Sequence, residues 1–156
     1  MLVESDKIEF KATKISQKGI NLIKKFEGLK LHSYRLQGEE HYTIGYGHTD
    51  PSVKQGQTIT EEEAEKLLVS DLEDYTTFVV NHCEYLNINQ NELDALVSFT
   101  YNAGKGNLKK LTANGTRTKE EIAAHITAYT KSKSEVNRNG LQKRRNEEKA
   151  MFIGNS

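Results

Sequence analysis

The amino-acid sequence predicts an α+β fold, in which a small β-sheet lobe is followed by a larger helical lobe. Aromatic and β-branched residues surround Gly38 over residues 34–46, which is typical of a hairpin or a three-stranded ribbon. Beyond residue 58, apolar residues recur at helical spacing behind capping motifs. A chain of 156 residues suits one domain. The expected parts are a polar N-terminal extension over 1–14 and a single domain over 15–156, with its β lobe at about 32–58 and its helical lobe at about 59–156.

The segment before the expected sheet predicts one short helix. Ser16 stands where a helix cap is expected, and Ile20, Ile23 and Phe26 then follow at helical spacing. The helix is expected to end at about Glu27. Residues 1–14 alternate only weakly and fit either a disordered extension or a short added strand.

Three capping boxes, in which the side chains of two residues cap a helix start reciprocally, predict the later helices. They pair Thr60 with Glu63, Asn89 with Glu92 and Thr118 with Glu121. The first predicts a long amphipathic helix to about Asn81, and the second a core helix that ends at Gly104. The third predicts a helix that carries Ile122, Ile126 and Tyr129, and a last helix is expected to begin near Leu141.

The charges are balanced overall but are unevenly distributed. Residues 1–104 hold 10 basic and 17 acidic residues, a net charge of −7, whereas residues 105–156 hold 12 basic and 5 acidic residues, a net charge of +7. A basic C-terminal third can bind nucleic acid or another anionic polymer such as bacterial cell wall. It can equally be the solvated face of a helix, so charge alone leaves these alternatives open.

Cys83 is the only cysteine, so no intramolecular disulfide can form. Its neighbours His82 and Glu84 suggest a metal or nucleophile site, but no second cysteine or spaced histidine set completes one. We therefore expect no metal and no cofactor. The N-terminus has no apolar stretch of signal-peptide length, and no 18-residue apolar run occurs. These features predict a protein made in the cytoplasm without a signal peptide.

Glu27 is the strongest candidate for a catalytic residue on local pattern alone. It closes the first predicted helix just before Gly28, a residue that readily adopts the conformation that ends a helix. The C-terminus of a helix carries partial negative charge, which disfavours an ionised carboxylate there. General acid catalysis near neutral pH needs a protonated carboxyl group. A Gly-rich hairpin follows directly, so the region is typical of an active site.

The sequence contains four ordered blocks that resemble the phage-type lysozymes of glycoside hydrolase family 24: FEGLKLHSYRLQGEEHYTIGYGHT, GQTITEEEAEKLL, LNINQNELDALVSFTYNAGKG and GLQKRRNEEKAMF. The resemblance covers nearly everything from Ile15 to Phe152. It implies a lysozyme-like fold with the substrate cleft between the two lobes. It also implies an endolysin, a bacteriolytic N-acetylmuramidase that hydrolyses the β-1,4 bond between N-acetylmuramic acid and N-acetylglucosamine in peptidoglycan.

The resemblance implies three catalytic positions, of which this chain matches two. Glu27 matches the family's glutamate and Thr43 matches its threonine, which would hold the attacking water. Leu36 stands where the family has an aspartate. Because glycosidases usually need two carboxyl groups, Glu39 is the favoured replacement, ahead of Glu40. The alternative interpretations are a solvated hairpin tip for the two acids and an ordinary strand residue for Thr43.

Further positions resemble residues beside the family's cleft. Gly45 and Gly47 flank Tyr46 and permit a close approach of a strand or a sugar. His48 would tune the site from a polar cluster near the catalytic glutamate. The remaining expected site residues are Asn102, which either binds an N-acetyl group or caps a helix, Gly104 and Arg144. Arg144 either orients Glu27 or belongs with Lys143 and Arg145 to a basic face paired with Glu147 and Glu148.

Two alternatives to a hydrolase follow from Leu36. A lytic transglycosylase needs one glutamate and no second carboxylate, whereas a catalytically inactive wall-binding protein would have lost its aspartate together with its activity. The resemblance further implies the glycan strands of peptidoglycan as partner. We expect no nucleic-acid partner, no stable membrane insertion and a monomer. The protein would be stored in the host cytoplasm and released with the help of a holin, as its relatives are.

Overall fold

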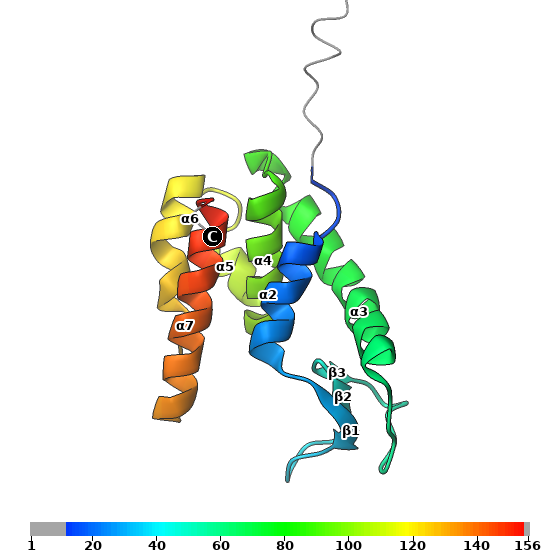
Figure 1. Cartoon of the computed structure of the whole chain (residues 1–156). Helices are drawn as coiled ribbons and strands as arrows, with labels where there is room; N and C mark the ends of the chain where they lie inside the picture. Colours follow the sequence, from blue (N-terminus) through cyan, green and yellow to red (C-terminus); the bar gives the residue numbers. More distant parts are fainter. Residues whose placement is uncertain (1–11, 155–156) are drawn as a thin grey trace, which may run out of the picture.

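The computed structural model describes residues 12–154, in which a small sheet lies at one end of a group of helices (Figure 1). The expected extension over residues 1–14 lies almost wholly outside the described residues. The elements, in chain order, are α2 (Gln17–Glu27), β1 (Lys30–Tyr34), β2 (Thr43–Gly45), β3 (His48–Thr49), α3 (Glu61–His82), the 3₁₀ helix η1 (Glu84–Leu86), α4 (Gln90–Ala103), α5 (Lys105–Leu111), α6 (Lys119–His125), the 3₁₀ helix η2 (Ile126–Ala128) and α7 (Glu135–Phe152). The architecture is α+β, as the sequence predicts.

The sheet is antiparallel, with strand order β1-β2-β3. Thr43 in β2 pairs with Thr49 in β3, and the register between β1 and β2 is irregular. The prediction of strands over residues 34–46 was too narrow, because β1 begins at Lys30 and β3 lies beyond Tyr46. Gly45 and Gly47 have φ angles of 71° and 91°, which bend the chain between β2 and β3. This bend turns the segment after β2 back toward the helices.

The core is built around α4, which packs against α2, α3, α5 and α7. All residues from 92 to 100 are buried, so this helix has hardly any exposed side in its middle part. Its fully buried apolar residues are Leu93, Ala95, Leu96, Val97 and Phe99. A helix that is buried all round must satisfy its polar side chains internally. One of them, the buried Ser98, donates its hydroxyl to Glu148 on α7.

All three predicted capping boxes are present, at Thr60, Asn89 and Thr118. The helix boundaries differ from prediction in the C-terminal half. α6 is only seven residues long and continues as η2, so Tyr129 follows the helical segment. The last helix begins at Glu135 instead of near Leu141, because the Ser134 side chain caps it by accepting a hydrogen bond from the N–H of Asn137.

The two long helices other than α4 each bury one side and expose the other. α3 runs for 22 residues and buries Ala64, Leu68, Leu72 and Val79. α7 carries charged residues along most of its length, and Arg144, Arg145 and Glu148 among them are buried. Between residues 12 and 154, none of the helices combines the length and the apolar character needed to cross a membrane.

Candidate active site

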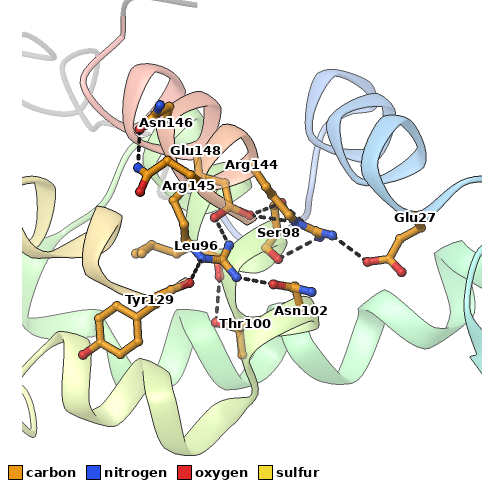
Figure 2. Close-up of polar contacts among 11 residues, drawn as sticks. Glu27, Leu96, Ser98, Thr100, Asn102, Tyr129, Arg144, Arg145, Asn146 and Glu148 are labelled. Carbon is orange, nitrogen blue, oxygen red and sulfur yellow. Dashed lines mark hydrogen bonds and ion pairs between the residues drawn. The ribbon is translucent and has the colours of Figure 1, made fainter. Parts of the chain in front are cut away.

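Glu27 is the last residue of α2 and is held by an arginine from the far end of the chain. The helix ends there because Gly28 has a φ of 72° and donates its N–H to the carbonyl of Lys24. Arg144 on α7 donates from Nη1 to Glu27 Oε2 at 2.7 Å (Figure 2). Arg144 is only 3% exposed, whereas the side chain of Glu27 is 19% exposed. The carboxyl group therefore has one face against a buried cation and another toward solvent.

A buried carboxylate, Glu148, holds this arginine in place. Glu148 Oε2 accepts hydrogen bonds from Arg144 Nε at 3.1 Å and from Ser98 Oγ at 2.5 Å (Figure 2). Its other oxygen accepts from Arg145 Nη1. Glu148 has no exposed surface. Buried charges persist when they are paired and hydrogen-bonded, and here two guanidinium groups alternate with two carboxylates.

Arg145 connects the same network to α4 and to the end of η2. It donates from Nη2 to Asn102 Oδ1 and from Nε to the carbonyl of Tyr129 at 2.9 Å (Figure 2). Its guanidinium lies 4.8 Å from the ring centroid of Phe99. Burial lowers the pKa of Arg145, and the charge of Glu148 opposes that shift. The alternative of a solvated basic face is therefore wrong for these two arginines, because both are buried, although both pair with Glu148.

A cleft of about 600 Å³ opens beside Glu27. Residues of α2, the β2–β3 region, α3 and α4 line it: Glu27, Gly47, Thr49, Ser70, Asp71, Asp74, Tyr75, Tyr101 and Asn102. Sequence reasoning singled out only Glu27, Gly47 and Asn102 among these. Asp71 and Asp74 are three residues apart on a predicted helix, a spacing that places both on one face. This spacing could have indicated from the sequence that two carboxylates lie on the same face of the helix and line the cleft.

Gly47 lets the hairpin approach Glu27 closely. A Cβ atom at this position would lie 3.1 Å from Glu27 Oε1 and 3.3 Å from the hydroxyl oxygen of Tyr101. Tyr101 also donates that hydroxyl to the carbonyl of Tyr46 at 3.0 Å. Gly45 instead faces α3, where a Cβ would lie 3.4 Å from that of Ala64. Of the two glycines, only Gly47 borders the cleft.

Thr43 lies directly behind the cleft wall. It is 7% exposed, and its hydroxyl oxygen lies 2.7 Å from that of Thr49, which does line the cleft. Tyr46 belongs to the core cluster instead of the cleft. Gly104 ends α4 with a φ of 94° and donates its N–H to the carbonyl of Thr100. Thr43 can therefore act on a ligand through Thr49, whereas Tyr46 packs in the core and Gly104 ends the helix.

The side chain of His48 contacts an aspartate on α3. Its Nδ1 donates to Asp71 Oδ2 at 2.8 Å, and both side chains are partly buried. The adjacent residue Gly47 is the one at which an added Cβ would meet Glu27. His48 therefore binds the carboxylate of Asp71, and its role in tuning the site stays a prediction.

Glu39 closes the turn between β1 and β2. Its Oε1 accepts the N–H of Leu36 at 2.8 Å, and its own N–H is donated to the carbonyl of Leu36 at 3.0 Å. Gly38 between them has a φ of 91°. Both Glu39 and Leu36 are exposed, and neither is among the described residues that line the cleft. The catalytic role of Glu39 stays a prediction.

Cys83 is a core residue. It is fully buried, and this burial raises the pKa of its thiol to about 12. Its neighbour His82 instead lies with Nε2 2.7 Å from the hydroxyl oxygen of Thr112. Across residues 12–154, no three His, Cys, Asp or Glu side chains are grouped in a way that could hold a metal ion.

Comparison with known proteins gives consistent matches. The phage lysozyme family model matches residues 24–148. An endolysin of Bacillus phage B103 is 42% identical over 143 residues, which make up 89% of this chain and 54% of that protein. An endolysin of Acyrthosiphon pisum secondary endosymbiont phage 1 is 35% identical over 88% of this chain and 97% of that protein.

Solved structures agree with these matches. The muramidase domain of SpmX from Asticaccaulis excentricus has a TM-score of 0.79 at 33% identity, covering 91% of this chain and 99% of that domain. The endolysin from Escherichia coli O157:H7 phage FAHEc1 has the same TM-score and identity, covering 94% of this chain and 98% of that protein.

A small sheet, a larger helical part and an acid-lined cleft define a lysozyme-like domain. The chain belongs to the phage lysozyme family. It spans about half the length of the related Bacillus phage endolysins, 54% of each.

Proposed function

We propose that the chain is an N-acetylmuramidase that hydrolyses the β-1,4 bond between N-acetylmuramic acid and N-acetylglucosamine in bacterial peptidoglycan. The observation that carries the proposal is the placement of Glu27, which ends α2, borders a cleft of about 600 Å³ and is oriented by the buried Arg144. Membership of the phage lysozyme family supports this activity. The names of the endolysins and of the muramidase domain that resemble the chain support it as well.

In this proposal Glu27 is the general acid. Its protonated carboxyl group gives a proton to the glycosidic oxygen as the bond to the anomeric carbon breaks. Arg144 fixes the orientation of the carboxyl group through Oε2, and Gly47 keeps the hairpin close to Oε1. Orientation matters because a misplacement of about 1 Å can cost about 100-fold in rate.

The other predicted site residues have supporting roles. Thr43 orients the attacking water through its hydrogen bond with Thr49. Asn102 offers its amide nitrogen to the N-acetyl group of a sugar, since its Oδ1 accepts from Arg145. Glu39 is the second carboxylate that the sequence favours, and it lies in the turn between β1 and β2.

The proposed substrate sets where the protein acts. It works on the glycan strands of the cell wall as a monomer, needs neither metal nor cofactor, and reaches the wall from the host cytoplasm by holin-assisted release. These points rest on the resemblance to phage endolysins.

Mass spectrometry of digested, purified peptidoglycan tests the proposed reaction. We expect fragments that end in a reducing N-acetylmuramic acid. Fragments that end in reducing N-acetylglucosamine would contradict the bond assignment, and 1,6-anhydro ends would identify a lytic transglycosylase. Binding to insoluble wall without release of sugar would identify an inactive binding protein.

A further inference from the structure

A second pocket, of about 490 Å³, lies next to the cleft and is formed by residues of α4, α5 and α7 and of the segment around η2. Asn102 lines both the cleft and this basic pocket, so the two share a wall. A substituent on a sugar bound in the cleft can therefore extend into the basic pocket. The polar and aromatic residues that line it are Asn102, Asn107, Lys110, Tyr129, Lys131 and Arg145.

The cleft and the basic pocket carry opposite charges. The acids that line the cleft are Glu27, Asp71 and Asp74. Among the described residues that line the basic pocket there is no acid, but there are two lysines and one arginine. A concave surface lined by charges of one sign concentrates the electric field and attracts ions of the opposite sign. The basic pocket therefore favours an anionic group.

The two lysines are the cations that such a group can reach. The guanidinium of Arg145 is already used, because it donates to Glu148, to Asn102 and to a backbone carbonyl (Figure 2). Lys110 and Lys131 are exposed, and neither takes part in an ion pair between residues 12 and 154. Ammonium groups bind carboxylates through charge-assisted hydrogen bonds. A carboxylate in the basic pocket would therefore supply the acidic partner that the lysines lack.

The uncharged residues of the basic pocket suit a peptide. Asn107 donates from Nδ2 to the carbonyl of Ala103 at 2.7 Å, which leaves its Oδ1 as an acceptor for a peptide N–H. The ring of Tyr129 packs edge-on against Phe99, with 5.2 Å between the ring centroids, so it forms a fixed apolar wall. An amide acceptor, an apolar wall and two ammonium groups together match a short peptide that carries carboxylates.

The proposed substrate has such a peptide, because N-acetylmuramic acid carries a stem peptide on its lactyl group. We propose that Lys110 and Lys131 bind free carboxylates of this stem peptide, so that the chain selects strands with free stem carboxylates over strands with amidated ones. Amidation replaces an anionic oxygen with an NH₂ group, which cannot accept a hydrogen bond from an ammonium group. The inference deepens the proposed function and rests on it.

Two soluble glycan substrates of equal length, one with free and one with amidated stem carboxylates, test this selectivity. We expect the parent chain to have a kcat/KM about 10-fold higher for the free form, because a hydrogen bond between charged groups is worth about that factor. In the double variant with Lys110→Gln and Lys131→Gln, we expect the ratio of the two kcat/KM values to fall to within about twofold of one. The lost preference should appear in KM, since the lysines lie away from the reacting bond.

A second double variant, with Lys14→Gln and Lys143→Gln, is the matched control. Both lysines are exposed, and neither lines the cleft or the basic pocket. This variant removes the same net charge, and we expect it to keep the preference of the parent chain. If the control also lost the preference, net charge would explain the selectivity and the assignment to Lys110 and Lys131 would be overturned.

The parent chain can also contradict the inference directly. A kcat/KM for the free form that is equal to or below that for the amidated form would overturn it. Strands stripped of their peptides keep the lactyl carboxylate, and cleavage of these strands as efficient as that of the free form would place the recognised anion on the sugar instead of the peptide. If the parent chain releases no reducing N-acetylmuramic acid from any of these substrates, the proposed function itself fails, which is a different result.

Discussion

Arg144 and Glu148 show at the scale of single residues how the site is kept in shape. Glu148 is fully buried and binds both Arg144 and Arg145, while Arg144 alone reaches Glu27. Removing one member of such a set leaves another charge buried without its partner. A buried charge without a partner destabilises the fold strongly, whereas replacing the whole pair with apolar residues often costs little. The network therefore predicts a large difference between this arginine and an exposed cation.

We expect Arg144→Ala to lower the free energy of unfolding by about 3–5 kcal/mol, because Glu148 loses a partner in the interior. Lys25→Ala is the control, since Lys25 forms an ion pair with Glu147 at 2.7 Å on the surface. We expect that change to cost less than about 1 kcal/mol. Urea denaturation measures both, and equal losses would contradict the account.

Replacing Gly47 tests whether close packing beside Glu27 affects catalysis independently of stability. An alanine there is strained at a φ of 91° and places its Cβ against Glu27 and Tyr101. Gly56 has a φ of 77° with nothing within 4 Å of the added atom. Both changes are expected to cost about 1–2 kcal/mol of stability. Only Gly47→Ala is expected to reduce kcat on peptidoglycan, by about 10- to 100-fold. An equal effect on kcat in both variants would argue against close packing at the acid.

At the scale of elements, the sequence predicted the capped helices α2, α3 and α4 better than the shorter helices, the start of α7 and the strands. Each capping box joins residues three positions apart, so it can be read locally, and all three are present. α5 was missed because Gly104 and Gly106 obscure its periodicity and it begins without a side-chain cap. β3 was missed because a strand of two residues is too short to show an alternation of apolar and polar residues. Its pairing depends on contacts with β2 instead.

The capping box of α3 provides a prediction at this scale. Thr60→Ala removes the hydroxyl that accepts the N–H of Glu63, so we expect a loss of about 1 kcal/mol in unfolding free energy. Thr77→Ala, on the exposed face of the same helix, is the control and is expected to be neutral or slightly stabilising. Thermal denaturation compares the two, and an unchanged Tm for Thr60→Ala would contradict the role of the cap.

At the scale of the whole molecule, the site depends on contacts that local patterns do not contain. Glu27 and Arg144 are 117 residues apart in the chain, and α2, α3, α4 and the hairpin must pack before a cleft exists. The resemblance to a family supplied Arg144, Thr43 and Asn102 as candidates. It gave no candidate for the second carboxylate, because Leu36 stands where the family has its aspartate. The fold added Asp71 to the cleft lining, because only packing reveals which face of α3 meets the hairpin.

Cys83 reports on the integrity of this packing. It is fully buried, and its pKa of about 12 leaves little thiolate at neutral pH. We expect a thiol reagent to react with the native chain at least about 100-fold more slowly than with the chain in urea, because reaction requires opening of the core. Immediate stoichiometric labelling of the native protein at pH 7 would show that the core around α3 and α4 is not closed.

The central claim is that Glu27 is the acid of a muramidase. The most direct measurement is the initial rate at which reducing N-acetylmuramic acid ends are released from purified peptidoglycan by Glu27→Gln and by the parent chain, with both shown to have the same Tm. The account predicts that the variant is at least about 100-fold slower. A variant that releases these ends as fast as the parent chain would contradict it.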